Sequence, residues 1–530
     1  MVVTLGLVLL LGLGQMPAMA QANERVKPRV VLMLDPELDD LNTLVRYLLY
    51  SNQFQTEGLV YQSSDVHWKG DDQGTPYDGP RGEHRRIGIH GPLTYWRWEE
   101  DESFIEDAVE IYAEVYPNLI VHAEGYPHPD ELRSRIFVGN VEFPGDMSKE
   151  SPGSELIKSL LLDDEPGPVY LLSGAGQSTI GRALLSIQEE YENTPEWPDI
   201  YKKVSNKAII QAWGDQDGVY ASYIGPNWPD IEFRDMRANV WGYGARGAVL
   251  PEDREYLSAA WMRQYVSDVG PFGEFYRVWG DGKQMSKGDL TDFFGFAGLT
   301  VEQLTELGYW VWLRSVGEPG SWISEGDTPI FLNLLDNGLD AHVDPTYGGW
   351  GGRDGEDIDP NGVPSRNYTS ARWFGAAQRD FAARMRWTVT PNYEDANHNP
   401  VVELVSPMNL LVRPGETVML RAIVRDPDGD NVTARWWQYV EAGTYPGRVT
   451  LSTVSEQRTS RPNYTYPADV PPPGSPAVAA VIRSEIDVAS QFTVPEDAVE
   501  GQTLHFILEA SDFGEPSLTT YLRVVLTVVE

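Results

Sequence analysis

RVVLMLDPELDDLNTLVRYLL, residues 29–49, places four carboxylates within six positions between two apolar runs. The run at 29–34 is almost continuously apolar, which is typical of a strand buried on both faces of a parallel sheet. From Leu41 onward, apolar residues recur at i, i+3, i+4, i+7 and i+8, which predicts one face of an amphipathic helix. A second apolar run at 56–63 predicts the next strand and completes a β-α-β unit of roughly thirty residues.

The same alternation of strand and helix continues to about residue 387. The runs at 167–176 and 207–215 predict further strands, and 178–191 predicts a helix. Strands that alternate with helices indicate an α/β fold with a mostly parallel, doubly wound sheet. Ligands of such sheets bind at the carboxyl ends of the strands. The acidic turn at 35–40 lies at one of these ends, so we expect the functional site there.

The composition changes near residues 392–400. Beyond this point, short β-rich runs alternate with turn sequences such as DPDGD, which predicts an all-β sandwich of roughly 130 residues. The predicted domains are therefore 28–395 and 400–530. Trp436 and Trp437 are adjacent on a predicted strand and must face opposite sides. We expect one in the core, and the other as a sugar platform or an interdomain contact.

The overall charge restricts the possible partners. Seventy-nine acidic against 41 basic residues give a net charge of −38, which argues strongly against nucleic acid as a partner. Residues 1–20 end in an A-x-A pattern and are interpreted as a signal peptide, which predicts a secreted or periplasmic protein. No later segment has the length and hydrophobicity of a membrane span. The absence of cysteine excludes thiolate metal sites and cysteine nucleophiles.

The four acids of the first turn are Asp35, Glu37, Asp39 and Asp40. Helix capping accounts for one of them, with Asp39 as the candidate N-cap, and surface charge is the alternative for the rest. Carboxylates this close raise one another's pKa unless a cation lies between them. Ca²⁺ prefers six to eight oxygen ligands and would relieve the repulsion. We favour a metal or catalytic role for this turn.

The stretch LDPELDDLNTLVRYLL resembles the signature D-x-D-P-G-x-D-D-A-x-A of nucleoside hydrolases. This resemblance implies that Asp35 is a Ca²⁺ ligand that also takes the proton of the attacking water. It further implies that Asp40 is a Ca²⁺ ligand and that Asp39 hydrogen-bonds the sugar hydroxyls. Met33 replaces the first aspartate, and Glu37 replaces a glycine, so the pocket should be narrower and more negative.

The resemblance extends over about 28–530 to a bacterial family of cellulose-binding proteins with a nucleoside hydrolase-like N-terminal domain and an immunoglobulin-like C-terminal domain. The blocks that carry it include YLLSGAGQSTIGRALLS, GDQDG, SEGDTPIFLNLLDNGL and YGGWGGRDG. It implies that the Ser178 carbonyl and the Asp327 side chain complete the calcium shell. For both residues, a helix N-cap is the alternative.

Further residues are candidates for the substrate pocket. Asp65 matches a sugar-contacting asparagine. The histidine that usually accompanies the late aspartate is missing, and Glu325 is expected to act as the acid for the leaving group. Trp350 lies on a glycine-rich loop and is expected either to stack on a sugar ring or to pack in the core. His67 lies near Asp65, but a lone histidine is more often structural.

Together these features predict an exported, Ca²⁺-dependent hydrolase of an N-glycosidic or related glycosyl bond. The alternative is a non-catalytic carbohydrate-binding protein that recognises cellulose. In either case, the expected partner is a sugar-containing small molecule or a polysaccharide.

Overall fold

The computed structural model describes residues 26–79, 81–295, 299–312, 317–456 and 484–530. The predicted signal peptide at 1–20 lies outside these residues. Among the described helices, none is both long and apolar enough to cross a bilayer.

Six parallel strands form the central sheet, in the order β3-β2-β1-β4-β5-β6. This confirms the predicted α/β class. The strand order reverses between β1 and β4, and ligands of open α/β sheets bind at such a switch point. The strands are β1 (Arg29–Leu34), β2 (Gln55–Tyr61), β3 (Ile136–Val138), β4 (Val169–Ser173), β5 (Ala208–Ala212) and β6 (Glu232–Asp235).

Strand β1 is buried on both faces, which explains its uninterrupted apolar sequence. Val30, Leu32 and Leu34 pack into one hydrophobic cluster, whereas Val31 and Met33 pack into another. Successive side chains of a strand point to opposite faces, so helices must cover both sides of the sheet. Met33 replaces an aspartate of the hydrolase signature, and here it is a core residue.

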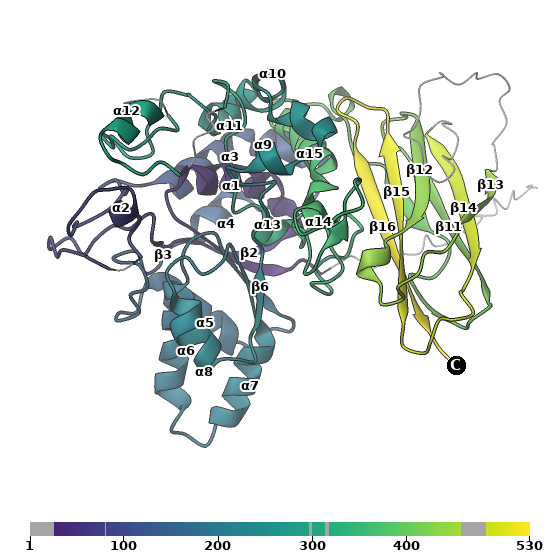
Figure 1. Cartoon of the computed structure of the whole chain (residues 1–530), viewed down its shortest axis with the longest axis horizontal. Helices are drawn as coiled ribbons and strands as arrows, with labels where there is room; N and C mark the ends of the chain where they lie inside the picture. Colours follow the sequence, from purple (N-terminus) through teal and green to yellow (C-terminus); the bar gives the residue numbers. More distant parts are fainter. Residues whose placement is uncertain (1–25, 80, 296–298, 313–316, 457–483) are drawn as a thin grey trace, which may run out of the picture.

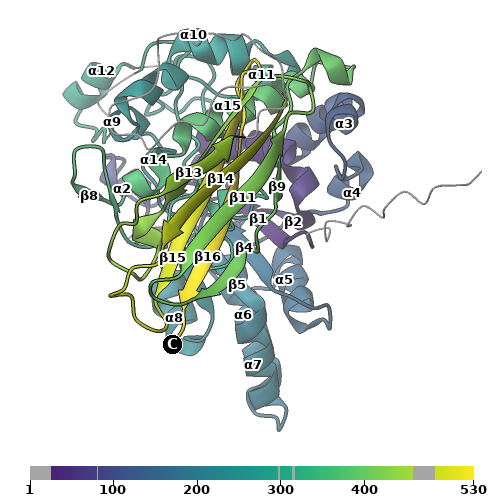
Figure 2. The ribbon, with the colours of Figure 1, turned by 90° about the vertical axis from the view of Figure 1, so that its right-hand side faces the viewer.

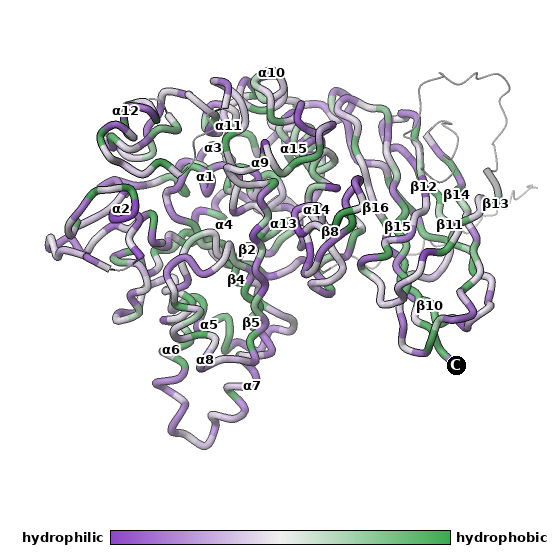
Figure 3. The backbone as a smooth tube through the Cα atoms, viewed as in Figure 1, coloured by the Kyte–Doolittle hydropathy of each residue, from purple (hydrophilic) through white to green (hydrophobic). Residues whose placement is uncertain are grey.

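Helices cover the two faces in separate groups (Figure 1). The first face carries α1 (Leu38–Leu49), α3 (Phe104–His122), α11 (Gly270–Phe275) and α15 (Phe374–Trp387), and the second carries α5 (Pro152–Leu162), α6 (Ser178–Tyr191) and α7 (Trp197–Lys207). The residues near α7 that project furthest from the sheet are hydrophilic (Figure 3). The shorter helices are α2 (Glu83–Arg86), α4 (Pro129–Arg133), α8 (Gly225–Asn227), α9 (Ala245–Ala248), α10 (Ala259–Met262), α12 (Val301–Glu306), α13 (Pro329–Leu332) and α14 (Tyr368–Ala371).

The C-terminal region consists of two four-stranded sheets, ordered β10-β16-β15-β12 and β13-β14-β11-β9 (Figure 2). Neighbouring strands are antiparallel except for β10 and β16, which confirms the predicted all-β region. The strands are β9 (Val401–Leu404), β10 (Asn409–Val412), β11 (Thr417–Arg425), β12 (Val432–Gln438), β13 (Ser452–Glu456), β14 (Glu485–Thr493), β15 (Thr503–Asp512) and β16 (Thr519–Val528); a small ribbon of β7 (Asp357–Ile358) and β8 (Pro364–Ser365) precedes them.

The adjacent tryptophans of β12 divide between two environments. Trp436 is buried in the core of the β-sandwich. Trp437 faces the α/β domain, where its ring lies 5.9 Å from that of Trp373 and the Arg372 guanidinium lies 4.8 Å above it. Of the two roles predicted for the second tryptophan, the structure therefore shows the interdomain contact.

Candidate functional site

A buried carboxylate cluster occupies the carboxyl end of β1. Asp35 follows the strand directly, and Asp39 and Asp40 lie in the first turn of α1, all three nearly inaccessible to solvent. The backbone N–H of Asp35 donates to Oδ1 of Asp40 at 3.2 Å, and that of Glu37 donates to Oδ1 of Asp35 at 3.1 Å. The N-cap of α1 is Glu37, so the alternative that Asp39 caps this helix is wrong.

Asp327 joins this cluster from nearly 300 residues away. Gly174, directly after β4, marks the meeting point: a Cβ there would lie 2.9 Å from Oδ1 of Asp40 and 3.0 Å from Cγ of Asp327. The charge of Asp327 also acts directly on Asp40, as expected for neighbouring carboxylates. Asp327 is not a helix cap, because Thr328 holds the N-cap position of α13. Both carboxylates therefore face the turn after β4, at the switch point of the sheet.

Burial and mutual repulsion raise the pKa of these groups. Burial is the largest cause throughout; it raises the pKa of Asp35 to about 8 and the pKa of Asp40 and Asp327 well above the ordinary carboxyl range. Neighbouring carboxylates add to the effect, since Asp327 acts on Asp40 and Asp39 acts on Asp327. Among the described residues, no lysine or arginine forms an ion pair with these groups, so a cation would stabilise their charged forms.

Asp39 forms hydrogen bonds with the segment that carries Asp327. Its Oδ2 accepts hydrogen bonds from the Ser324 hydroxyl at 2.8 Å and from the Gly326 N–H at 3.2 Å, and its Oδ1 accepts from the Tyr243 hydroxyl at 3.3 Å. All three donors are groups of this chain, and two of them lie close to Asp327 in the sequence. Asp39 thus holds Asp327 beside α1, a positioning role in addition to the sugar contact predicted for it.

Glu325 points away from the cluster and cannot serve as the predicted free acid. It is fully buried, and Arg46 donates to both of its carboxylate oxygens, at 2.5 and 3.0 Å. The hydroxyls of Tyr276 and Thr328 donate to it at 2.5 and 3.0 Å. Four hydrogen bonds, two of them from one guanidinium, therefore occupy this carboxylate. Glu325 is therefore a structural ion-pair partner.

Trp350 is a core residue, the second of its two predicted roles. Its side chain is 2 % exposed and belongs to the main hydrophobic cluster. Its backbone carbonyl accepts hydrogen bonds from Trp241 and Ser370, which fix the glycine-rich loop against the core. A ring buried in this way offers no face to a sugar.

Aromatic residues that the sequence analysis missed line a pocket beside the cluster. The lining includes Glu37, Phe294, Trp310 and Trp312, and the two tryptophans are 48 % and 39 % exposed. The ring of Tyr243 stacks on Phe294 at 4.8 Å and meets Trp312 edge-on at 5.2 Å, while its hydroxyl donates to Glu37 at 3.0 Å. An aromatic wall thus runs from the surface to the acids. The signal in the sequence was the short aromatic run YWVW at 309–312.

Ser178 is the first residue of α6, and among the described contacts none joins it to the acids. Its N–H donates to Oδ2 of Asp217 at 2.9 Å, and its hydroxyl accepts from Gln62 at 2.6 Å. Gln177 holds the N-cap position of α6, so the alternative that Ser178 caps this helix is wrong. The backbone that reaches the carboxylates after β4 is that of Gly174.

Asp65 and His67 lie on the loop after β2 and flank the cluster. Asp65 is ion-paired with Arg86 at 3.2 Å, and its charge acts on Asp35. His67 is fully buried, with Nδ1 3.4 Å from Oδ1 of Asp35 and 3.8 Å from Oε2 of Glu37. Both predicted positions therefore belong to the surroundings of Asp35.

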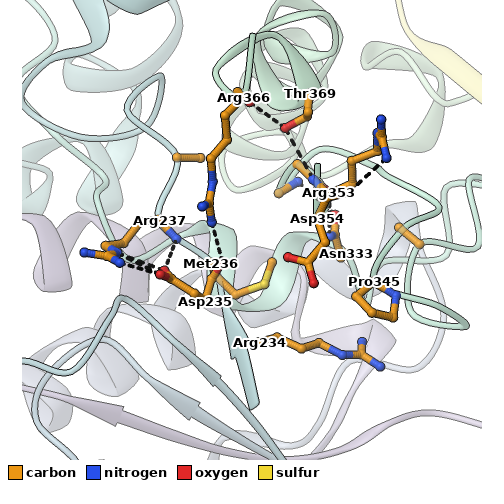
Figure 4. A pocket seen from close by; sticks show the side chains of 14 residues that line it. Arg234, Asp235, Met236, Arg237, Asn333, Pro345, Arg353, Asp354, Arg366 and Thr369 are labelled. Atoms are coloured by element: carbon orange, nitrogen blue, oxygen red, sulfur yellow. Dashed lines mark hydrogen bonds and ion pairs between the residues drawn. The ribbon is translucent and has the colours of Figure 1, made fainter. Parts of the chain in front are cut away.

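A second pocket at the end of β6 is lined by arginines (Figure 4). Arg237 pairs with Asp235, Arg234 with Glu232 at 2.7 Å, and Arg353 with Asp357 at 2.6 Å. Acids neutralise these three guanidinium groups, and the fourth arginine, Arg366, donates to the Asp235 backbone carbonyl at 3.4 Å, so most of the positive charge in this pocket is already compensated.

A doubly wound sheet whose switch point carries a carboxylate cluster, completed by a distant aspartate, defines a nucleoside hydrolase-like protein. Comparison with protein families narrows this class. Residues 29–353 match the family described as "Cellulose-binding Sde182, nucleoside hydrolase-like domain", and residues 417–528 match "Cellulose-binding protein Sde0182, C-terminal domain". The chain belongs to this family of cellulose-binding proteins.

Among solved structures, a nucleoside hydrolase-related protein from Saccharophagus degradans, described as associated with carbohydrate metabolism, is similar over 95 % of this chain and 100 % of its own, with 23 % identity and a TM-score of 0.62. This similarity supports the fold. A family 123 glycoside hydrolase from Clostridium perfringens aligns over 25 % of this chain and 27 % of its own, with 10 % identity and a TM-score of 0.18, too low to support an argument. Comparison with curated proteins finds no match.

Proposed function

We propose that this protein is an exported, Ca²⁺-dependent hydrolase of a glycosyl bond in a sugar-containing substrate. The observation that carries the proposal is the convergence of Asp35, Asp40 and Asp327 at the switch point of the sheet. Three carboxylates without a lysine or arginine partner are costly to bury unless a cation accompanies them.

The donor set suits calcium. Ca²⁺ prefers several oxygen ligands, often carboxylates, at about 2.3–2.6 Å. Asp35, Asp40 and Asp327 would hold the ion, and the pKa of each is raised by burial first and by neighbouring carboxylates second. When bound, such an ion supplies Lewis acidity to a water or to a substrate hydroxyl.

Side chains of the protein would carry out the proton transfer and the positioning. The Asp35 carboxylate would accept the proton of the attacking water, and the Ser64 side chain, which hydrogen-bonds to it, would orient it. Asp39 keeps Asp327 in place through Ser324 and Gly326. Asp35 would thus act as the base, and the contacts of Asp39 would keep Asp327 in position beside it.

The aromatic wall would bind the sugar. Trp310 and Trp312 expose large flat surfaces beside Glu37, and apolar contact with such rings removes a sugar face from water. They take the role that the sequence analysis offered to Trp350. The wall also limits the access of water to the carboxylates, which strengthens electrostatic interactions in the site.

Two of the glutamates near the site are held by arginines and are not free to protonate the leaving group. Glu37 and Glu83 are the carboxylates among the described residues that line the aromatic pocket, and Glu83 is paired with Arg97 at 2.9 Å. Glu325 is held by Arg46. Of these three glutamates only Glu37, whose pKa is raised by burial, is left as a candidate proton donor, so substrates with stable anionic leaving groups, such as aryl glycosides, should react fastest.

The test uses the full-length mature chain with 4-nitrophenyl ribosides and glucosides, and thermal unfolding with and without Ca²⁺. We expect Ca²⁺ to raise the Tm and to support hydrolysis. Asp40→Asn should abolish the Ca²⁺-induced shift and lower kcat/KM by at least about 100-fold, equivalent to roughly 3 kcal/mol. Asp101→Asn, at an exposed position, is the matched control and should leave both unchanged.

A non-catalytic carbohydrate-binding protein is the second candidate, favoured by the exposed Trp310 and Trp312. In that case the wild type would cleave no glycoside but would be retained on insoluble cellulose, and Trp312→Ala would weaken retention several-fold. Hydrolysis that survives Asp40→Asn would contradict both the calcium assignment and the proposed mechanism.

A further inference from the structure

The buried imidazole of His67 has no hydrogen-bond partner at either ring nitrogen among the described residues. It is 0 % exposed, on the loop between β2 and α2. A neutral imidazole carries one N–H donor and one acceptor nitrogen, and leaving a buried polar group unpaired costs about 1–3 kcal/mol. A fully buried ring with two free nitrogens therefore calls for a ligand, and imidazole nitrogen is a common ligand of transition metals.

The surroundings of Nδ1 supply two oxygen ligands. Nδ1 lies 3.4 Å from Oδ1 of Asp35 and 3.8 Å from Oε2 of Glu37, and one ligand atom from each of the three residues lies within 4.8 Å of the other two. Nitrogen and oxygen ligands about 2.0–2.2 Å from a shared ion are separated from one another by roughly 3–4 Å. The three side chains therefore have the spacing of a metal site before any movement.

Glu37 is oriented for this role by a neighbour. The Tyr243 hydroxyl donates to its Oε1 at 3.0 Å, which leaves Oε2 facing His67. Contacts of this kind, one bond removed from the ion, fix ligand orientation in metal sites. Glu37 also lines the aromatic pocket, so an open coordination position there would be reachable from outside.

We propose that Asp35, Glu37 and His67 form a second divalent-cation site, selective for a first-row transition ion such as Zn²⁺ or Mn²⁺. The site requires the glutamate that replaces the glycine of the hydrolase signature. It lies beside the calcium position, and Asp35 is common to both. One nitrogen and two carboxylate ligands favour a borderline ion over Ca²⁺, which prefers oxygen alone. Only the neighbouring calcium ion rests on the proposed function; the transition-metal site stands without hydrolysis.

The test measures Zn²⁺ binding to the full-length, tag-free chain by titration calorimetry, with Co²⁺ absorption as a second readout. The chain has no cysteine, so visible Co²⁺ bands cannot come from thiolates. We expect one high-affinity Zn²⁺ per chain. His67→Gln and Glu37→Gly should each weaken it by at least about tenfold, and both should keep the Ca²⁺-induced Tm shift. His90→Gln, at an exposed histidine, is the control and should bind Zn²⁺ as the wild type does.

The two proposals fail in different ways. Asp40→Asn should remove the calcium response and retain Zn²⁺, whereas Asp35→Asn should weaken both. Undiminished Zn²⁺ affinity in both Glu37→Gly and His67→Gln would overturn the second site, as would a wild type that binds no Zn²⁺. Glu37 is partly exposed, so Glu37→Gly remains informative if His67→Gln fails to fold. Zn²⁺ binding by a wild-type protein that shows no Ca²⁺-induced Tm shift would support this site and overturn the proposed function.

Discussion

Asp35 links the two proposed cation positions, and its ionisation should govern cation binding. Burial is the main reason that its pKa rises from 3.8 to about 8. Because this folded-state pKa lies above the unfolded value, the carboxyl group stabilises the cation-free protein at low pH. That contribution is lost as the pH rises through about 8. A bound cation must displace the proton of the Asp35 carboxyl group, so cation affinity increases as the pH rises.

We therefore expect the Tm in EDTA to fall between about pH 5 and pH 8.5, and the Ca²⁺-induced Tm shift to grow over the same range. Calorimetry in two buffers of different ionisation enthalpy should detect proton release on binding. Asp35→Asn is the control and should reduce both trends without abolishing them, because the pKa values of Asp40 and Asp327 are also raised. A Ca²⁺-induced shift that is constant from about pH 6 to pH 9 would contradict the assignment.

Gly174 provides a second test of the convergence of the carboxylates. In Gly174→Ala, the new methyl group would lie within about 3 Å of the Asp40 and Asp327 carboxyl groups and would push them apart. We expect at least a tenfold loss of Ca²⁺ affinity, measured by calorimetry. Gly247→Ala, where a Cβ meets no atom within 4 Å, should leave the affinity unchanged. Equal affinities in the two variants would show that Gly174 does not border the ion.

Two residues of helix α1 contact the segment 321–328, and the two contacts have different roles. Asp39 accepts hydrogen bonds from Ser324 and Gly326, and Arg46, almost two turns further along α1, pairs with Glu325. The first contact positions a carboxylate of the site, and the second anchors the segment inside the core. A buried ion pair of this kind is costly to break, because the remaining charge has no partner.

Glu325→Gln should therefore lower the free energy of unfolding by about 3–5 kcal/mol. The Ca²⁺-induced shift and the pH profile of kcat should persist, because Glu325 is not the proton donor. Glu403→Gln removes a solvent-exposed partner of Arg425 and should cost at most about 1 kcal/mol by the same denaturant titration. Loss of the alkaline limb of the pH profile in Glu325→Gln would instead restore the acid role.

The whole molecule is held together by an aromatic and cationic contact between its two domains. Trp437 from β12 packs near Trp373 and under Arg372, and the Tyr439 hydroxyl donates to Asp357 at 2.7 Å. Because this side of β12 is covered by the α/β domain, the β-sandwich and the hydrolase-like domain share one core.

Trp437→Ala should uncouple the domains, since it removes a large ring and the cation–π contact from this boundary. We expect calorimetric unfolding to split into two transitions, with a lower first Tm. Met419→Ala, at an exposed position of β11, should leave a single transition at the wild-type temperature. A single unshifted transition in Trp437→Ala would show that the contact does not couple the domains.

Local periodicity was sufficient to predict the elements that build the site. The apolar run at 29–34 is β1, and the predicted helix at 178–191 is α6 (Ser178–Tyr191). Both depend on side-chain spacing within one segment, and burial follows directly from that spacing. Asp35, Asp39 and Asp40 share one turn, so their proximity was also visible in the sequence.

Pairing between distant segments required the folded structure. Asp327 reaches the cluster, but Glu325, two residues earlier, turns toward Arg46. Likewise, Trp350 is buried while Trp312 faces the pocket. The amino-acid sequence by itself determined the α/β class, the acidic turn and the β-rich C-terminal region, because each follows from composition and short-range spacing. Only the tertiary structure decided which distant side chains face one another, because side-chain direction depends on how elements pack.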